Sequence, residues 1–153
     1  MNSNGNKPIL LTTENYLTMI KNSIGSKMFR NCYALVGNKK KDLLKNGDLS
    51  CAYFVTSILK IFDLIGSIHL TVRGAIEDIK NSGWYEIKSP KKGSILVWEK
   101  EKSGKEEHAH IGFYAGDQKA ISNSFKRQAP IIHNYFFRSR KVEAIFWNKK
   151  LDK

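Results

Sequence analysis

The sequence has few cysteines and no long apolar run. Of its 153 residues only Cys32 and Cys51 are cysteines, which excludes a disulfide framework, and they form no CxxC pair or zinc-type spacing. No stretch reaches the roughly 18 consecutive apolar residues of a membrane-spanning helix. The first residues also lack the charged segment and apolar run of a secretory signal peptide. We therefore expect no transmembrane segment, and a protein that is cytoplasmic as written or exported by a non-classical route.

Acidic residues are scarce as well. Lys and Arg number 26 against 14 for Asp and Glu, which gives a formal net charge of +12. Most of this charge is interpreted as a solvated basic surface, which favours an anionic partner such as a cell-wall polymer or nucleic acid. Hydrophobic residues make up 41% of the chain, too many for a disordered protein. The length predicts one domain over residues 11–153, preceded by a flexible tail at residues 1–10.

Helical patterns occupy the first half of the chain. Thr12 or Thr13 is expected to cap a helix that runs to about Ile24. The segment 26–50 is expected to be irregular. Residues 51–65 are apolar nearly all round, which predicts a central buried helix, and the segment TVRGAIEDIKNSG has helical spacing and ends at a glycine.

Short strands are predicted after Gly83. The segments are rich in β-branched and aromatic residues and are separated by turn residues: GWYEI, GSILVWE, HAHIGFYAG, KAISNS, PIIHNYFF and VEAIFW. This order of elements predicts an α+β domain. In it, N-terminal helices pack on a C-terminal antiparallel sheet of about five to six strands.

Cys51 lies where the central helix should begin. A helix N-terminus carries a partial positive charge and unpaired N–H groups, and both favour a thiolate. Cys51 is therefore a candidate nucleophile whose pKa is expected to be lowered. The alternative is a buried, inert cysteine at the edge of the core.

A nucleophilic cysteine needs a base, and the histidines are the candidates. His108 and His110 point the same way on one predicted strand, with Ile111 and Phe113 on the opposite face. His69 is interpreted as a surface residue between two helices. His133 is interpreted as structural, with a position lining the site as the alternative.

Three segments carry a resemblance to the NlpC-type cysteine peptidases of the papain-like superfamily. SCAYFV resembles the nucleophile motif, PKKGSILVWE the strand before the histidine, and HIGFYAGDQKAI the histidine strand with its following turn. The likeness covers residues 32–124. It implies a papain-like fold in which Cys51 is the nucleophile and His110, 59 residues later, is the base.

The family orients its histidine with a third polar residue on the next strand. Strict spacing leads to Ser122, whereas the side-chain chemistry favours Asn123, which is the residue that we select. Tyr33 stands where the family often has a tyrosine in the site. One expectation is that its hydroxyl helps to hold an oxyanion. The alternative is that Tyr33 is a packed aromatic side chain.

The chain departs from the family next to the nucleophile. The usual Asp-Cys-Ser-Gly is replaced by Ser50-Cys51-Ala52-Tyr53, with Asp48 as a more distant acid. The flanking residues Asp48, Ser50 and Tyr53, together with His108, are expected to contact substrate. We expect Tyr53 to narrow the pocket and to weaken cleavage of standard stem peptides.

The function predicted by these features is hydrolysis of an amide bond, in a peptidoglycan-type peptide by resemblance, through an acyl-enzyme and without a cofactor. One alternative is a papain-like amidase or acyltransferase acting on another substrate. Another is a non-catalytic basic module that binds nucleic acid, for which HNYFFRSRK is the candidate segment. A zinc site built on His108, His110 and a third ligand is the least favoured interpretation.

Overall fold

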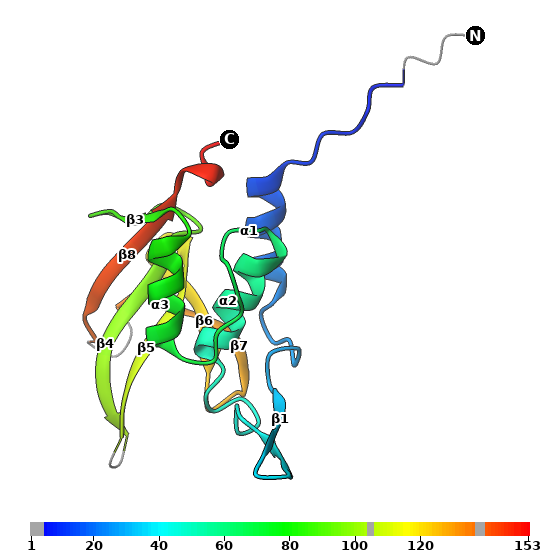
Figure 1. The fold of residues 1–153 in the computed structure, drawn as a ribbon. Helices are drawn as coiled ribbons and strands as arrows, with labels where there is room; N and C mark the ends of the chain where they lie inside the picture. Colours follow the sequence, from blue (N-terminus) through cyan, green and yellow to red (C-terminus); the bar gives the residue numbers. More distant parts are fainter. Residues whose placement is uncertain (1–4, 104–105, 137–139) are drawn as a thin grey trace.

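A computed structural model describes residues 5–103, 106–136 and 140–153. In this part of the chain, helices and an antiparallel six-stranded sheet form an α+β fold, as the sequence predicts (Figure 1). The helices are α1 (Thr12–Asn22), α2 (Cys51–Ile61) and α3 (Val72–Asn81). None of the described helices is both long and apolar enough to span a bilayer. Residues 5–11 form no helix or strand and are exposed. Residues 1–4 of the expected tail lie outside the described range.

The strands follow one another closely along the second half of the chain. They are β3 (Trp84–Glu86), β4 (Ile95–Ser103), β5 (Glu106–Gly116), β6 (Lys119–Ser124), β7 (Ala129–Asn134) and β8 (Val142–Asn148). Their order in the sheet is β3-β8-β4-β5-β6-β7, and every neighbouring pair is antiparallel. The prediction of five to six strands is confirmed, and β5 lies in the middle of the sheet.

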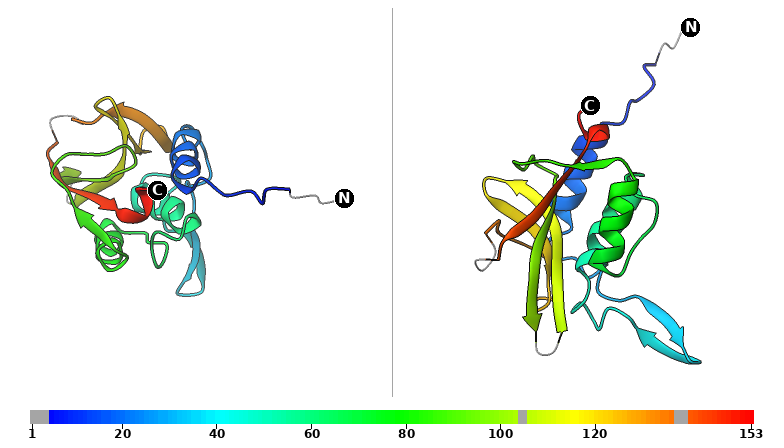
Figure 2. Two further views of the ribbon diagram at one scale, coloured as in Figure 1. Left: turned by 90° about the horizontal axis from the view of Figure 1, so that it is seen from above. Right: turned by 60° about the vertical axis from the view of Figure 1, so that its left-hand side comes forward.

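The helices cover one face of the sheet (Figure 2). The strands alternate their side chains between the two faces, so Ile111 and Phe113 of β5 enter the core beneath the helices. The Phe54 ring of α2 meets the Phe113 ring edge-on at 5.5 Å. Full burial of each such side chain contributes roughly 1.5–3 kcal/mol. The prediction that 51–65 holds a buried central helix is confirmed, although α2 ends at Ile61.

The other face of the sheet has a smaller core of its own. Leu96, Trp98, Ala120 and Ile145 are buried there. His110 belongs to this face, and its ring lies 5.4 Å from the Trp98 ring. The predicted opposition of His110 to its neighbours Ile111 and Phe113 is therefore confirmed.

The expectation that residues 26–50 are irregular is wrong. They contain a hairpin of β1 (Tyr33–Val36) and β2 (Lys39–Asp42), which projects from the body of the molecule (Figure 1). Gly37 and Asn38 both have positive φ angles and form a two-residue turn of the type that matches the twist of a hairpin. The lysine run 39–41 therefore lies on a strand.

The helix starts also differ from the predicted caps. Residue Leu11 precedes α1, and no side chain caps this helix. The Thr13 hydroxyl instead donates a hydrogen bond to the Leu151 carbonyl at 3.0 Å, which ties the first helix to the end of the chain. Ser50 precedes α2, again without a side-chain cap, whereas Thr71 caps α3 by accepting from Gly74 N–H.

Candidate active site

Cys51 is the first residue of α2, and its side chain is half-buried against the sheet. The backbone N–H groups of Ile111, Ala52 and Cys51 itself are placed to stabilise its thiolate. Ile111 directly follows His110 on β5, so the nucleophile candidate is held against the strand that carries the base candidate. A direct hydrogen bond between the Cys51 thiol and the His110 ring remains a prediction.

The expected lowering of the Cys51 pKa is wrong. Burial raises the pKa of the thiol, and the N–H groups of Ile111, Ala52 and Cys51 and the charge of Arg140 offset this only in part. The helix start does favour the thiolate, but removal of the sulfur from water has the larger effect. The surroundings of Cys51 therefore favour the neutral thiol over the thiolate.

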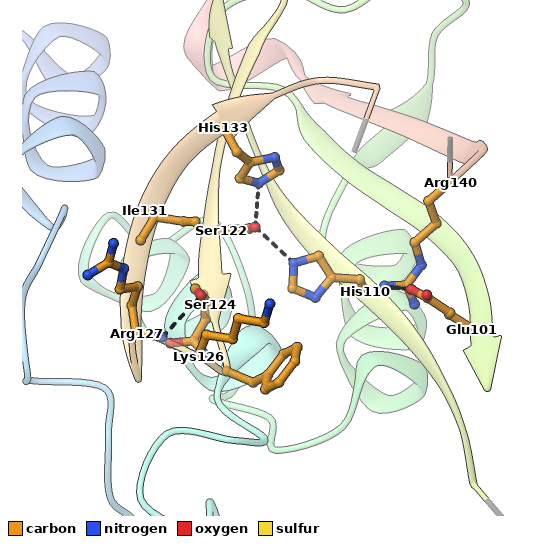
Figure 3. A pocket seen from close by; sticks show the side chains of 11 residues that line it. Glu101, His110, Ser122, Ser124, Lys126, Arg127, Ile131, His133 and Arg140 are labelled. Carbon is orange, nitrogen blue, oxygen red and sulfur yellow. Dashed lines mark hydrogen bonds and ion pairs between the residues drawn. The ribbon is translucent and has the colours of Figure 1, made fainter. Parts of the chain in front are cut away.

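His110 belongs to a chain of hydrogen bonds that crosses three strands (Figure 3). Its Nε2 lies 2.8 Å from the Ser122 hydroxyl oxygen. The same oxygen lies 2.6 Å from Nε2 of His133. The Nδ1 of His133 lies 2.8 Å from the carbonyl oxygen of Asn134. The structure therefore brings together His110, Ser122 and His133.

Strand register explains why these three residues meet. On β6 and β7, Ala120 pairs with His133 and Ser122 pairs with Ile131, so Ser122 and His133 are diagonal neighbours on one face. On β5, Gly112 is the next residue after His110 on that face. A Cβ at Gly112 would lie 2.7 Å from the Ser122 Cβ and 2.8 Å from the Ile121 carbonyl oxygen. The absence of a side chain at Gly112 lets β6 approach closely enough for the His110–Ser122 hydrogen bond.

The electrostatic surroundings keep His110 neutral. Burial lowers its pKa, and the positive charge of Arg140 and the neighbouring His133 lower it further, to about 3. The pKa of His133 is also lowered, chiefly by burial. The Trp98 ring lies beside both imidazoles, 5.4 Å from His110 and 5.7 Å from His133. At pH 7 the hydrogen-bond chain therefore joins two neutral rings.

A pocket of about 250 Å³ opens beside this chain of hydrogen bonds (Figure 3). Lys126 and Arg127 line one side of the pocket, and Arg140 and Glu101 line the opposite side. His110, Ser122 and His133 also line it, whereas Cys51 does not. Three cations against one carboxylate make the pocket suited to an anionic group.

Arg140 is held firmly at the edge of the pocket. Its Nε donates to the Glu99 carbonyl oxygen at 2.7 Å, and its Nη2 donates to the His108 carbonyl oxygen. Its Nη1 lies 3.4 Å from the Glu101 carboxylate. The guanidinium charge favours the Cys51 thiolate and disfavours a protonated His110.

The selection of Asn123 as the orienting residue is corrected by these hydrogen bonds. Successive residues of β6 point to opposite faces, so Ser122 reaches His110 and Asn123 does not. The buried Asn123 amide donates from Nδ2 to the Gly47 carbonyl oxygen at 2.8 Å. Its Oδ1 is buried and has no hydrogen-bond partner among the described residues. Asn123 thus holds the loop that leads into Cys51.

Two of the expected substrate contacts lie away from the pocket. Ser50 is fully buried, so it cannot contact a substrate, and its hydroxyl has no partner in the described part of the chain. Tyr53 is half-buried and lines a second hollow, on the side of α2 that faces Met28 and Phe29. Tyr53 is thus not among the residues that line the pocket beside His110, and its expected narrowing of the substrate pocket beside Cys51 stays a prediction.

The remaining predicted residues are exposed. Asp48 lies in the loop before Cys51, and His108 lies on β5 two residues before His110. The Tyr33 side chain on the hairpin is 61% exposed, with the Lys40 ammonium 4.6 Å from the centre of its ring. The interpretation of Tyr33 as a packed aromatic is therefore wrong, and a role of its hydroxyl in holding an oxyanion stays a prediction.

The sequence predicts no site role for Gly112 or Arg140 and favours a structural role for His133. The signal for Gly112 is its position between His110 and Tyr114 on one face of the strand, where a small residue permits close approach of the neighbouring strand. Arg140 was one member of a basic run, and nothing in the run distinguishes it. Among the described residues, no group of three or more His, Cys, Asp or Glu side chains could hold a metal ion.

The geometry defines a class of site, in which a cysteine at a helix start lies against the strand that carries a histidine. No protein-family model and no curated protein matches the chain.

Proposed function

We propose that the chain is a thiol hydrolase of the papain-like, NlpC type that cleaves an amide bond. The observation that carries the proposal is the 2.8 Å hydrogen bond between Nε2 of His110 on β5 and the hydroxyl of Ser122, twelve residues further along the chain. The residue after His110, Ile111, supplies a backbone N–H that favours the Cys51 thiolate. A cysteine at a helix start and a histidine oriented by a polar residue are the components of a nucleophilic dyad. The α+β arrangement supports the papain-like interpretation.

In the proposed reaction both members of the dyad start neutral. The Cys51 sulfur attacks the amide carbonyl carbon while its proton moves to Nδ1 of His110, and the carbonyl becomes an oxyanion. The negative charge of the oxyanion favours a protonated His110 and so offsets the effect of burial, which otherwise keeps the ring neutral. Arg140 also stabilises the negative charge of the oxyanion. Backbone N–H groups at the start of α2 are suited to hold the oxyanion.

The second half of the reaction restores the enzyme. The C–N bond breaks as His110 returns its proton to the leaving amine, which leaves an acyl group on the Cys51 sulfur. A water molecule then loses a proton to His110 and attacks the acyl carbon. The C–S bond breaks, the acid is released, and Cys51 regains its proton.

The pocket supports a substrate that carries a carboxylate near the scissile amide, because Lys126 and Arg127 line it beside His110. Peptidoglycan-type peptides have this chemistry, as do other acidic peptides. A lipid amide, as in the acyltransferase alternative, suits this charged pocket less well. For the nucleic-acid alternative, residues 137–139 of HNYFFRSRK lie outside the described residues, and Tyr135 packs its ring against Tyr114.

The test compares wild type with Cys51→Ala and with Cys32→Ala, which removes the other thiol. Each protein is incubated with peptides that differ only in a carboxylate or carboxamide beside the scissile bond, and products are followed by mass spectrometry. We expect cleavage of the carboxylate peptides by wild type and Cys32→Ala, and none by Cys51→Ala. Cleavage that survives in Cys51→Ala, or tight DNA binding without any cleavage, would contradict the proposal.

A further inference from the structure

The Ser122 hydroxyl bridges two imidazole rings, and it has one proton to give. Its oxygen lies 2.8 Å from Nε2 of His110 and 2.6 Å from Nε2 of His133. A hydroxyl can donate to one of these nitrogens and accept from a proton on the other. The directions of the two hydrogen bonds are therefore linked.

The far end of the chain sets the direction. The carbonyl oxygen of Asn134, 2.8 Å from Nδ1 of His133, can only accept, so Nδ1 of His133 carries a proton. In a neutral ring the other nitrogen is then an acceptor, and Ser122 must donate to it. Ser122 in turn accepts from Nε2–H of His110, which leaves the lone pair of His110 on Nδ1.

We propose that His133 is a positioning residue that fixes, through Ser122, the tautomer of His110 in which Nδ1 is the proton acceptor. The meaning of this tautomer for catalysis rests on the proposed function, because a proton on Nδ1 would prevent His110 from accepting the proton of the thiol. The tautomer itself is a property of the resting protein, and it can be measured without any substrate.

Protonation of His133 would reverse the chain. Both nitrogens of His133 would then donate, Ser122 would donate to Nε2 of His110, and the His110 proton would move to Nδ1. Burial lowers the pKa of His133, the hydrogen bond to the Asn134 carbonyl raises it, and the charge of Lys119 on β6 lowers it, with a lowered pKa as the net result. The His110 ring on β5 is joined to His133 through Ser122, and the Trp98 ring on β4 lies 5.7 Å from it. Arg140, Lys126 and Arg127 add positive charge across the pocket.

The experiment uses the full chain with ¹⁵N-labelled histidine and long-range ¹H–¹⁵N correlation spectra, which distinguish the two neutral tautomers. We compare wild type with Ser122→Ala, with His133→Phe, which keeps a ring beside Trp98 but cannot accept, and with His133→Gln, whose side-chain oxygen can accept from Ser122. Ile132→Ala, at an exposed neighbouring position of β7, is the control for disturbance of the strand.

We expect Nε2–H on His110 and Nδ1–H on His133 in wild type, and the same His110 tautomer in His133→Gln and Ile132→Ala. Ser122→Ala and His133→Phe are expected to show mixed His110 tautomers and a kcat lower by about tenfold or more, with little change in KM. A wild-type His110 that carries its proton on Nδ1, or a His133→Phe protein with the wild-type tautomer, would overturn the inference. The expected tautomers in a chain without hydrolase activity would overturn the proposed function instead.

Discussion

Replacement of Gly112 by alanine tests whether the close approach of β5 and β6 builds the site. The new Cβ would lie 2.7 Å from the Ser122 Cβ, 2.8 Å from the Ile121 carbonyl oxygen and 3.2 Å from the Trp98 ring. Carbon atoms pack at about 3.5 Å or more, so β6 must retreat by roughly 0.8 Å. A comparable shift would stretch the His110–Ser122 hydrogen bond from 2.8 Å to about 3.6 Å, beyond effective range.

Two effects are therefore expected from Gly112→Ala. Overpacking lowers the free energy of unfolding by about 1–3 kcal/mol, and loss of the hydrogen bond lowers turnover. Ser122→Ala is the matched comparison, because it removes the hydroxyl without adding a Cβ. It is expected to lose similar turnover but only about 1 kcal/mol of stability.

Urea unfolding followed by tryptophan fluorescence measures the stability of both variants, and the histidine spectra measure the state of His110. A Gly112→Ala protein with the wild-type unfolding midpoint and an unchanged His110 signal would contradict the proposed role of the close approach of β5 and β6. That outcome would mean that β5 and β6 adjust without disturbing the hydrogen-bond chain.

Three further outcomes follow from the charges and pKa values. Because burial raises the pKa of Cys51 above that of an ordinary thiol, its alkylation by iodoacetamide should be slow near pH 7 and faster as the pH rises, and a rate that is already maximal near pH 6 would indicate a preformed ion pair. Burial alone would raise the pKa of Asp78, but hydrogen bonds from His69, Ser82 and two backbone N–H groups lower it to about 2. Its stabilisation is thus present above about pH 4 and is lost as the pH falls towards 2, so Asp78→Asn should cost about 1–2 kcal/mol at pH 7 and nearly nothing at pH 2 in urea melts. Retention on an anionic polymer should weaken steeply between about 50 and 500 mM salt, and unchanged retention would count against electrostatic binding.

The sequence predicts the main elements well because each has a strong local pattern. The apolar run after Cys51 predicts α2, and period-two alternation places His110 opposite Ile111. The hairpin turn at Gly37 and Asn38 was a readable signal, but the polar strand that follows has no apolar face. Strand β2 is held by backbone pairing and by the Asp42 side chain, which accepts hydrogen bonds from Cys32 N–H and Leu44 N–H.

The details of the site depend on register and burial, which no short segment specifies. Selection between Ser122 and Asn123 requires the length of the turn after β5, in which Asp117 and Gln118 both have positive φ angles. Because this turn has two residues, counting from His110 leads to Ser122 as the residue that contacts the histidine. The raised Cys51 pKa follows from the packing of distant strands around a helix start, so local sequence predicts its direction wrongly.

Acylation by p-nitrophenyl acetate tests directly whether Cys51 is the nucleophile and His110 its base, and this small ester can be used without knowledge of the natural substrate. Rapid acid quenching and peptide mass mapping would locate the acetyl group and give its rate of formation in wild type, Cys32→Ala and His110→Ala. We predict an acetyl group on Cys51 that forms and then hydrolyses, at a rate about 100-fold lower in His110→Ala and unchanged in Cys32→Ala. Acetylation of Cys32 instead, or an equal rate at Cys51 without His110, would contradict the assignment of Cys51 as nucleophile and His110 as its base.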